Sequence, residues 1–161
     1  MFEDEVLEDN TPAMQHDLNR FIIAQDPVFD DAISELKAGQ KRSHWMWFIF
    51  PQIHGLGHSE TAKRYAIKST DEARAYLNHP ILGTRLLECA EAVKAIQNRS
   101  ASQIFGCPDD MKFRSSLTLF ASVSEEKSIF HELIAKYYAG KPDERTIEIL
   151  KAQDVNERRQ K

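Results

Sequence analysis

The residues best suited to chemistry are concentrated in residues 41–59, with the sequence KRSHWMWFIFPQIHGLGHS. This stretch contains both tryptophans of the chain, three of its six histidines, a Lys-Arg pair and two glycines separated by one residue. Histidine exchanges protons near neutral pH, cationic side chains bind anions, and tryptophan rings stack on planar groups. The combination favours a binding site for a small anionic ligand, with or without a reaction on that ligand.

A second polar cluster, at residues 109–116, supplies further groups for such a site. Lys41, Arg42 and Lys112 would neutralise the charge of the ligand. His44 is the candidate catalytic residue, because it would donate or shuttle a proton. The sequence leaves open whether the two clusters meet in space. The other predicted ligand-binding residues are Trp45, Trp47, Gln52, His54, Gly55, Gly57 and Ser115.

Each of these features also has a structural explanation. Any one histidine can be a surface residue, and the glycines at 55 and 57 can form an ordinary turn. The two tryptophans would point in different directions on a helix, so one can be core while the other lines a pocket; both can also be core. His54 and His58 have the spacing of zinc ligands, but the glycines between them disfavour a helix. We therefore predict no metal site and no cofactor.

The composition is typical of one soluble globular domain, with 161 residues, 42% hydrophobic and 29% charged. The first ten residues carry five acids and no base, so the rest of the chain is nearly neutral despite a net charge of −4. This argues against a general nucleic-acid-binding protein. Residues 37–68, in contrast, hold six lysines and arginines against one acid. They form either a patch that attracts an anion or an ordinary solvated face.

The sequence favours a cytoplasmic protein without a membrane partner. Its two cysteines form no CxxC motif, which fits a reducing compartment. The N-terminus has acids where a signal peptide has bases and an apolar run. The longest apolar run, residues 45–50, is far shorter than the roughly 18 residues of a membrane helix. No motif identifies a protein partner.

The elements that must position these groups are predicted to be helices. Apolar residues recur at helical spacing over residues 27–38 and 80–98, and Pro108 is predicted to open a helix through residue 122. Ser59 and Asp143 are predicted N-caps, and Ser69 with Glu72 has the capping-box pattern. Residues 44–50 fit a buried helix or a buried strand, and we favour a helix because the chain offers no strand partner.

The predicted fold is therefore all-α, a single compact multi-helix domain of seven to nine helices that spans residues 14–153. Residues 1–13 are predicted to be a disordered acidic arm. Residues 154–161 are predicted to be a charged tail.

Three motifs of the chain resemble one uncharacterised bacterial family. They are GQKRSHWMWFIFPQIHGLGHS, then YAI with EARAYLNHPILGTRL, then IFGCPDDMKFRSSLTLF. Over about residues 16–150 the chain is similar to domain-of-unknown-function family 1810, which is sometimes labelled calpastatin. The resemblance implies a compact, mostly α-helical domain and carries no established activity. The calpastatin label has no physical support, since calpain-inhibiting segments are disordered and this chain is predicted to be packed.

Two functions are consistent with these patterns. The first is the binding of a small anionic ligand, phosphorylated or nucleotide-like, and it requires His44, Gln52 and Lys112 to converge in a concave site. The second is a protein-interaction module with no small-molecule site, and it predicts a flat apolar patch with scattered polar groups. The density of different reactive groups within residues 41–59 favours the first, and leaves open whether the protein is an enzyme.

Overall fold

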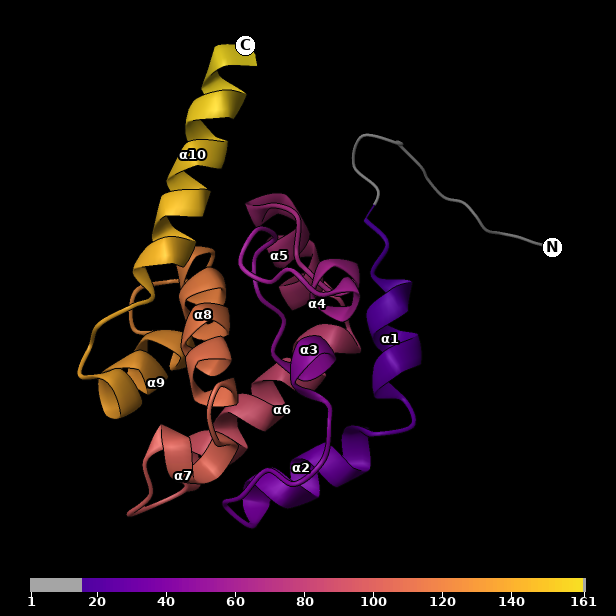
Figure 1. Ribbon diagram of the computed structural model, residues 1–161, viewed down its shortest axis with the longest axis vertical. Helices are drawn as coiled ribbons and strands as arrows, with labels where there is room; N and C mark the ends of the chain where they lie inside the picture. The colour runs from indigo at the N-terminus through magenta and orange to yellow at the C-terminus, as the bar shows by residue number, and fades with distance from the viewer. Residues whose placement is uncertain (1–15, 161) are drawn as a thin grey trace, which may run out of the picture.

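The structure is a computed structural model that describes residues 16–160, and the predicted acidic arm at 1–13 lies outside this range. The described residues form ten α-helices and no β-strand. Figure 1 shows their arrangement. The helices are α1 (Asn19–Gln25), α2 (Phe29–Lys37), α3 (Met46–Ile49), α4 (Glu60–Arg64), α5 (Thr70–Asn78), α6 (Leu82–Ala95), α7 (Ala101–Phe105), α8 (Asp109–Ser122), α9 (Ile129–Tyr138) and α10 (Glu144–Gln160).

The all-α class is confirmed, but the predicted number of seven to nine helices is too low for the described residues. Three of the ten helices, α3, α4 and α7, have only four or five residues each, so the total depends on whether such short segments are counted as helices. Helices this short are stabilised by caps and tertiary packing rather than by intrinsic propensity. The Ser59 hydroxyl accepts a hydrogen bond from Ala62 N at 3.0 Å, as predicted. Ser100 and Gln103 form a capping box at the start of α7.

Helix α8 is the central element, because it contacts α3, α5, α7, α9 and α10. All side chains at residues 115–121 are buried, so this part of α8 has no polar face. Figure 1 shows α8 and α9 side by side near the base of α10, which extends beyond the rest of the molecule. The first turn of α8, in contrast, is only partly buried at Asp109 and Lys112. Those two residues are therefore available to a surface site.

One hydrophobic cluster joins the two halves of the described chain. It includes buried residues from Phe21 in α1 to Phe130 in α9, and Leu150 of α10 packs against it. Aromatic rings form its centre, with ring centroids 4.9 Å apart for Phe50 and Phe113. Trp45 is also fully buried in this cluster. The loop before α3 is thus anchored in the core on one side and free to present polar groups on the other.

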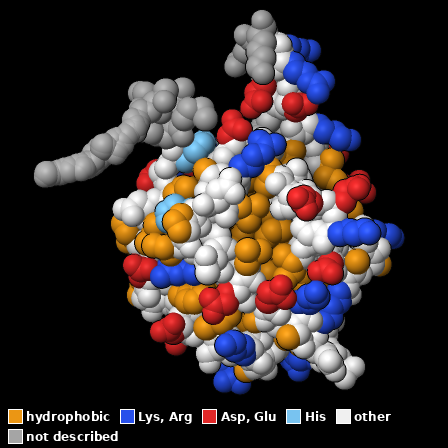
Figure 2. Space-filling model, turned by 180° about the vertical axis from the view of Figure 1, so that it is seen from behind, with side chains coloured by type: hydrophobic (Ala, Val, Ile, Leu, Met, Phe, Trp, Pro, Cys, Tyr) orange, Lys and Arg blue, Asp and Glu red, His pale blue; other side chains and the backbone are white. Residues whose placement is uncertain are grey.

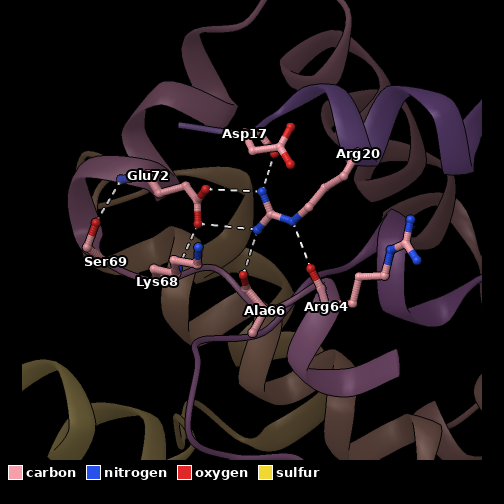
Figure 3. A network of polar contacts seen from close by, with 7 residues as sticks. All are labelled: Asp17, Arg20, Arg64, Ala66, Lys68, Ser69 and Glu72. Atoms are coloured by element: carbon pink, nitrogen blue, oxygen red, sulfur yellow. Dashed lines mark hydrogen bonds and ion pairs between the residues drawn. The ribbon is translucent and has the colours of Figure 1, made fainter. Parts of the chain in front are cut away.

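A buried ion pair joins α1 to α5, and the same arginine also bonds to the end of α4 and the segment that follows it (Figure 3). Arg20 Nη1 lies 3.3 Å from Glu72 Oε2, and the two side chains are only 10% and 2% exposed. The same guanidinium donates to the carbonyl oxygens of Arg64 and Ala66, each at 2.8 Å, and to that of Asp17. The Arg20 guanidinium therefore contacts several segments of the chain at once.

Glu72 also changes how α5 begins. Its backbone N–H donates to the Ser69 hydroxyl at 3.1 Å, which is the first half of the predicted capping box. Its carboxylate does not return to Ser69 but pairs with Arg20 and accepts from Lys68 N at 2.7 Å. The second half of the predicted box is absent because a tertiary ion pair has replaced a local hydrogen bond.

The last helix begins where predicted and continues past the predicted boundary. Asp143 caps α10, since its Oδ2 accepts from Thr146 N at 2.9 Å. No glycine or proline follows Asp143, so no local signal ends the helix before Gln160. The charged residues at 154–159 are exposed and helical.

Candidate functional site

The two polar clusters meet at the N-terminal end of α8. Lys41 Nζ lies 2.9 Å from Asp109 Oδ2, and Lys112 Nζ lies 3.1 Å from Asp109 Oδ1. Burial alone would raise the pKa of Asp109, but hydrogen bonds and charge attraction from the two lysines lower it below its usual value. One carboxylate therefore bridges two ammonium groups, and one positive charge remains.

Both tryptophan rings lie against these lysines. Lys112 Nζ is 3.8 Å from the centroid of the Trp47 ring, and Lys41 Nζ is 5.1 Å from that of Trp45. Such contacts are attractive because the face of an indole is electron-rich. Trp45 is fully buried whereas Trp47 is half-buried. Trp47 is therefore the ring that a ligand can reach.

Two adjoining hollows open at this cluster. We call the smaller one, of about 100 Å³, the His44 lobe. We call the larger one, of about 220 Å³, the Gln52 lobe. Trp47 and Lys112 line both, so we describe the two hollows as two lobes of one cleft. The His44 lobe is lined by Lys41, His44, Trp45, Trp47, Asp109 and Lys112. The Gln52 lobe is lined by Trp47, Gln52, Lys112, Ser115, Asp143 and Arg145, with apolar contacts from its other walls.

Glu35 of α2 holds the loop at 41–45 that supplies the His44 lobe. Its Oε1 accepts from the backbone N–H groups of Arg42 and Ser43 at 2.7 and 2.9 Å and from Trp45 Nε1 at 2.9 Å. The Ser43 hydroxyl donates to Oε2. Partial burial would raise the pKa of Glu35, but these hydrogen bonds lower it from 4.5 to about 2. Nothing in the local sequence relates Glu35 to this loop, because it appears as one acid on the polar face of a helix.

Gln52 is positioned by an isolated bridge between Ile53 and Ile67. Ile67 N donates to the Gln52 carbonyl oxygen at 2.8 Å, and His54 N donates to the Ile67 carbonyl oxygen at 2.8 Å. This fixes the backbone at Gln52, which lines the larger lobe and whose side-chain amide has no hydrogen-bond partner among residues 16–160. The backbone at Gln52 is thus held by hydrogen bonds, whereas its side chain is free to bind a ligand.

Two other cleft residues have side chains free to bind. His44 is exposed in the smaller lobe, and Arg145 is exposed in the larger one. Neither side chain forms a hydrogen bond or an ion pair with another residue in the part of the chain that the structure describes. Arg145 was not predicted, because it lies far along the chain in a charged helix. Lys41 and Lys112, in contrast, are already paired with Asp109.

Three of the predicted ligand-binding residues do not line the cleft. Arg42 contributes only its backbone N–H to Glu35, and its side chain is exposed. His54 is exposed outside both lobes. Gly55 has a φ of +108°, a conformation that favours glycine, and an added Cβ would lie 3.4 Å from Ile149 Cδ1. A turn explains Gly55 without a ligand.

Gly57 and Ser115 do line the larger lobe, and both also have structural roles. An added Cβ on Gly57 would lie 2.5 Å from Ala62 Cβ, so only glycine lets this loop pack against α4. Ser115 is 6% exposed, and its hydroxyl donates to the Met111 carbonyl oxygen at 3.1 Å. The side chains that converge in the cleft are therefore His44, Trp47, Gln52 and Lys112, together with Arg145.

The described residues contain no group of three or more histidine, cysteine or acidic side chains placed to hold a metal ion. No helix within residues 16–160 combines the length and apolar character that crossing a membrane requires.

Comparisons with known proteins place the chain in a family. The chain belongs to the family described as protein of unknown function (DUF1810), whose model matches residues 15–150. The family predicted from the sequence motifs is thus confirmed. Every residue that lines the cleft lies within the matched range.

A solved structure is also similar to the chain. It is the crystal structure of the conserved hypothetical protein Rv1873 from Mycobacterium tuberculosis, with 53% sequence identity and a TM-score of 0.82. The similarity covers 83% of this chain and 96% of that one. No curated protein matches the chain.

Proposed function

We propose that the cleft binds a small anionic ligand, such as a phosphorylated metabolite or a nucleotide. The observation that carries the proposal is the convergence of His44, Gln52 and Lys112 around Trp47 in one concave site. These residues come from two segments more than 50 positions apart in the sequence. An interaction module with scattered polar groups does not require such convergence.

The charge at the cleft supports an anion as the ligand. Lys41 and Lys112 already pair with one anionic group, the carboxylate of Asp109, which supports the proposal that they bind an anionic ligand. An anionic group of a ligand would approach Lys112 and His44 from the open side and would share the lysines with Asp109. His44 is exposed at this position and is the candidate for proton exchange with the ligand.

The test uses one substitution expected to weaken binding and one expected to strengthen it. Lys112→Met removes a cation, so it should weaken the binding of inorganic phosphate and of phosphorylated compounds by about tenfold or more. Asp109→Asn removes the internal competitor and a negative charge, so it should tighten binding. Dissociation constants from titration calorimetry at fixed ionic strength measure both effects.

Lys94→Met is the matched control, because Lys94 also pairs with an acid, Glu132, at 3.1 Å, but lies outside the cleft. It should leave binding unchanged. The proposal fails if no phosphorylated compound binds, or if Asp109→Asn weakens binding in a variant that remains folded.

The alternative, a protein-interaction module, has one feature in its favour. Figure 2 shows hydrophobic side chains gathered on one face beside the base of α10, with charged side chains around them. Between α8, α9 and α10 lies a groove of about 270 Å³, lined in part by Ala121, Ile134, Ile147 and Leu150. Failure of every phosphorylated compound to bind would favour this groove over the cleft as the functional surface.

A further inference from the structure

We infer, on the basis of the proposed function, that the ligand has two chemically different parts, one for each lobe. A single compact anionic group, the size of one phosphate, occupies the His44 lobe. A planar ring with hydrogen-bonding groups on its edge occupies the Gln52 lobe. The ligand class is a nucleoside monophosphate or another phosphomonoester of a planar heterocyclic compound.

The two lobes differ in charge. The His44 lobe contains the ammonium groups of Lys41 and Lys112 and one carboxylate, that of Asp109, so it retains a positive charge. In the Gln52 lobe, apart from the shared Lys112, the charges of Asp143 and Arg145 oppose each other. An anionic group is therefore more stable in the His44 lobe, and an uncharged group is better suited to the Gln52 lobe.

The Gln52 lobe also has the surface that a planar ring needs. The Trp47 ring forms one wall, and Leu56, Pro108 and Met111 add apolar area, with Met111 46% exposed. The unpaired Gln52 amide offers both a donor and an acceptor, while the Arg145 guanidinium offers donors. A heterocycle matches these walls and edges together, whereas the polyol of a sugar phosphate would leave the apolar walls without a partner.

The relative sizes of the lobes favour the same arrangement. The His44 lobe has a volume of about 100 Å³. This smaller lobe suits one compact tetrahedral anion better than a chain of phosphates or a ring. The Gln52 lobe has more than twice the volume, about 220 Å³, and accepts a ring.

The experiment compares whole and partial ligands on the full chain. Adenosine, uridine, their 5′-monophosphates and 5′-triphosphates, and inorganic phosphate are titrated by calorimetry into the unaltered protein and into His44→Ala and Gln52→Leu. We expect at least one monophosphate to bind about tenfold more tightly than phosphate or the matching nucleoside, and no more weakly than its triphosphate. Each substitution should weaken monophosphate binding by about tenfold.

Inorganic phosphate and the nucleosides, each matching one part of the ligand, test the two lobes separately. His44→Ala should weaken phosphate binding and spare the nucleoside, whereas Gln52→Leu should weaken nucleoside binding and spare phosphate. Thermal unfolding midpoints establish that each variant is folded, and Arg145→Gln, on an exposed position, provides a second variant for the ring lobe.

The outcomes distinguish this inference from the proposed function. If phosphate binds and Lys112→Met abolishes that binding, but no monophosphate binds more tightly and neither ring-lobe variant has an effect, the two-part ligand is wrong and the anion site stands. If neither phosphate nor any nucleotide binds, both proposals are wrong.

Discussion

At the residue scale, Glu35 is the side chain on which the shape of the His44 lobe depends most. Its carboxylate accepts hydrogen bonds from two backbone N–H groups, a hydroxyl and the Trp45 indole of the loop at 41–45. Two of these partners are the backbone N–H groups of Arg42 and Ser43. A neutral or shorter side chain at this position would leave several donors unpaired.

Glu35→Gln should therefore destabilise the protein by about 1–3 kcal/mol at neutral pH, because hydrogen bonds to a charged acceptor are lost. The pKa of Glu35 falls from 4.5 to about 2 in the folded protein, so its charge stabilises the fold fully above about pH 4.5. This contribution is lost as the pH falls from 4.5 towards 2.

Urea unfolding measured from pH 7 to pH 2.5 checks the effect. The difference in unfolding free energy between the two proteins should narrow below pH 4.5. A difference that stays constant over this range would show that the charge of Glu35 does not contribute.

The residue types alone identified some of the cleft residues before the structure was known. The role of Asp109 depends instead on ion pairs between distant segments. His44, Trp47, Gln52 and Lys112 are unusual enough in combination to be noticed without a structure. Asp109 fits one local role, since an acid in the first turn of α8 interacts favourably with the helix dipole. Its second role, bridging Lys41 and Lys112, depends on a contact with a segment 68 residues earlier. No spacing rule predicts a contact over that distance.

At the scale of elements, α5 and α6 approach each other closely at Gly83, near the start of α6. A Cβ on Gly83 would lie 2.0 Å from the carbonyl oxygen of Leu77 in α5. Real Cβ atoms do not approach a backbone oxygen this closely, so α5 and α6 can pack as they do only with glycine at this position.

Gly83→Ala should thus cost about 3 kcal/mol or more, at the upper end of overpacking substitutions, because backbone rather than a flexible side chain must move. Gly140→Ala is the control: Gly140 has a φ of +78° and nothing within 4 Å of an added Cβ. It should cost only about 1 kcal/mol, from the left-handed conformation alone. Chemical denaturation of the two variants gives the comparison, and equal losses would contradict the close approach of α5 and α6.

Helix boundaries were predictable where the signal was local. Ser59 and Asp143 cap their helices as their types suggest, because an N-cap bond spans only three residues. The Ser69–Glu72 pattern was misleading in its second half, since Arg20 offers Glu72 a buried partner from another helix. The local capping rule therefore fails at Glu72, because its carboxylate pairs with a charge from a distant part of the chain.

At the scale of the whole molecule, the Arg20–Glu72 pair ties α1 to the rest of the fold (Figure 3). Both side chains are almost fully buried, so each charge depends on the other for its compensation. The neighbouring pair of Asp71 and Arg74, at 3.2 Å, lies on the same helix but is more than half exposed.

Glu72→Ala should cost about 3–5 kcal/mol, because it leaves the Arg20 guanidinium buried without a counter-charge. Asp71→Ala, the matched control, should change stability by less than about 1 kcal/mol. Thermal and urea unfolding measure both. Similar effects for the two substitutions would mean that the Arg20–Glu72 pair contributes no more than a surface ion pair.

The helical class followed from apolar residues at helical spacing, whereas the arrangement of helices did not. Residues 115–121 of α8 are buried on all sides, so the helix has no apolar stripe that would indicate which neighbour it faces. Its central position results from the shape of the surrounding helices. The same position brings Lys112 to Trp47, which is why the two polar clusters of the sequence share one cleft.

The chain contains only two tryptophans, and both lie at the cleft. The tryptophan emission of the whole protein therefore originates there. Trp45 is sealed from solvent, so its emission should be blue and constant, whereas Trp47 is half-buried with an ammonium group 3.8 Å from its ring centroid. A molecule that enters the cleft and displaces Lys112 changes the electric field across that indole. The tryptophan fluorescence of the unlabelled protein should therefore change when a molecule occupies the cleft.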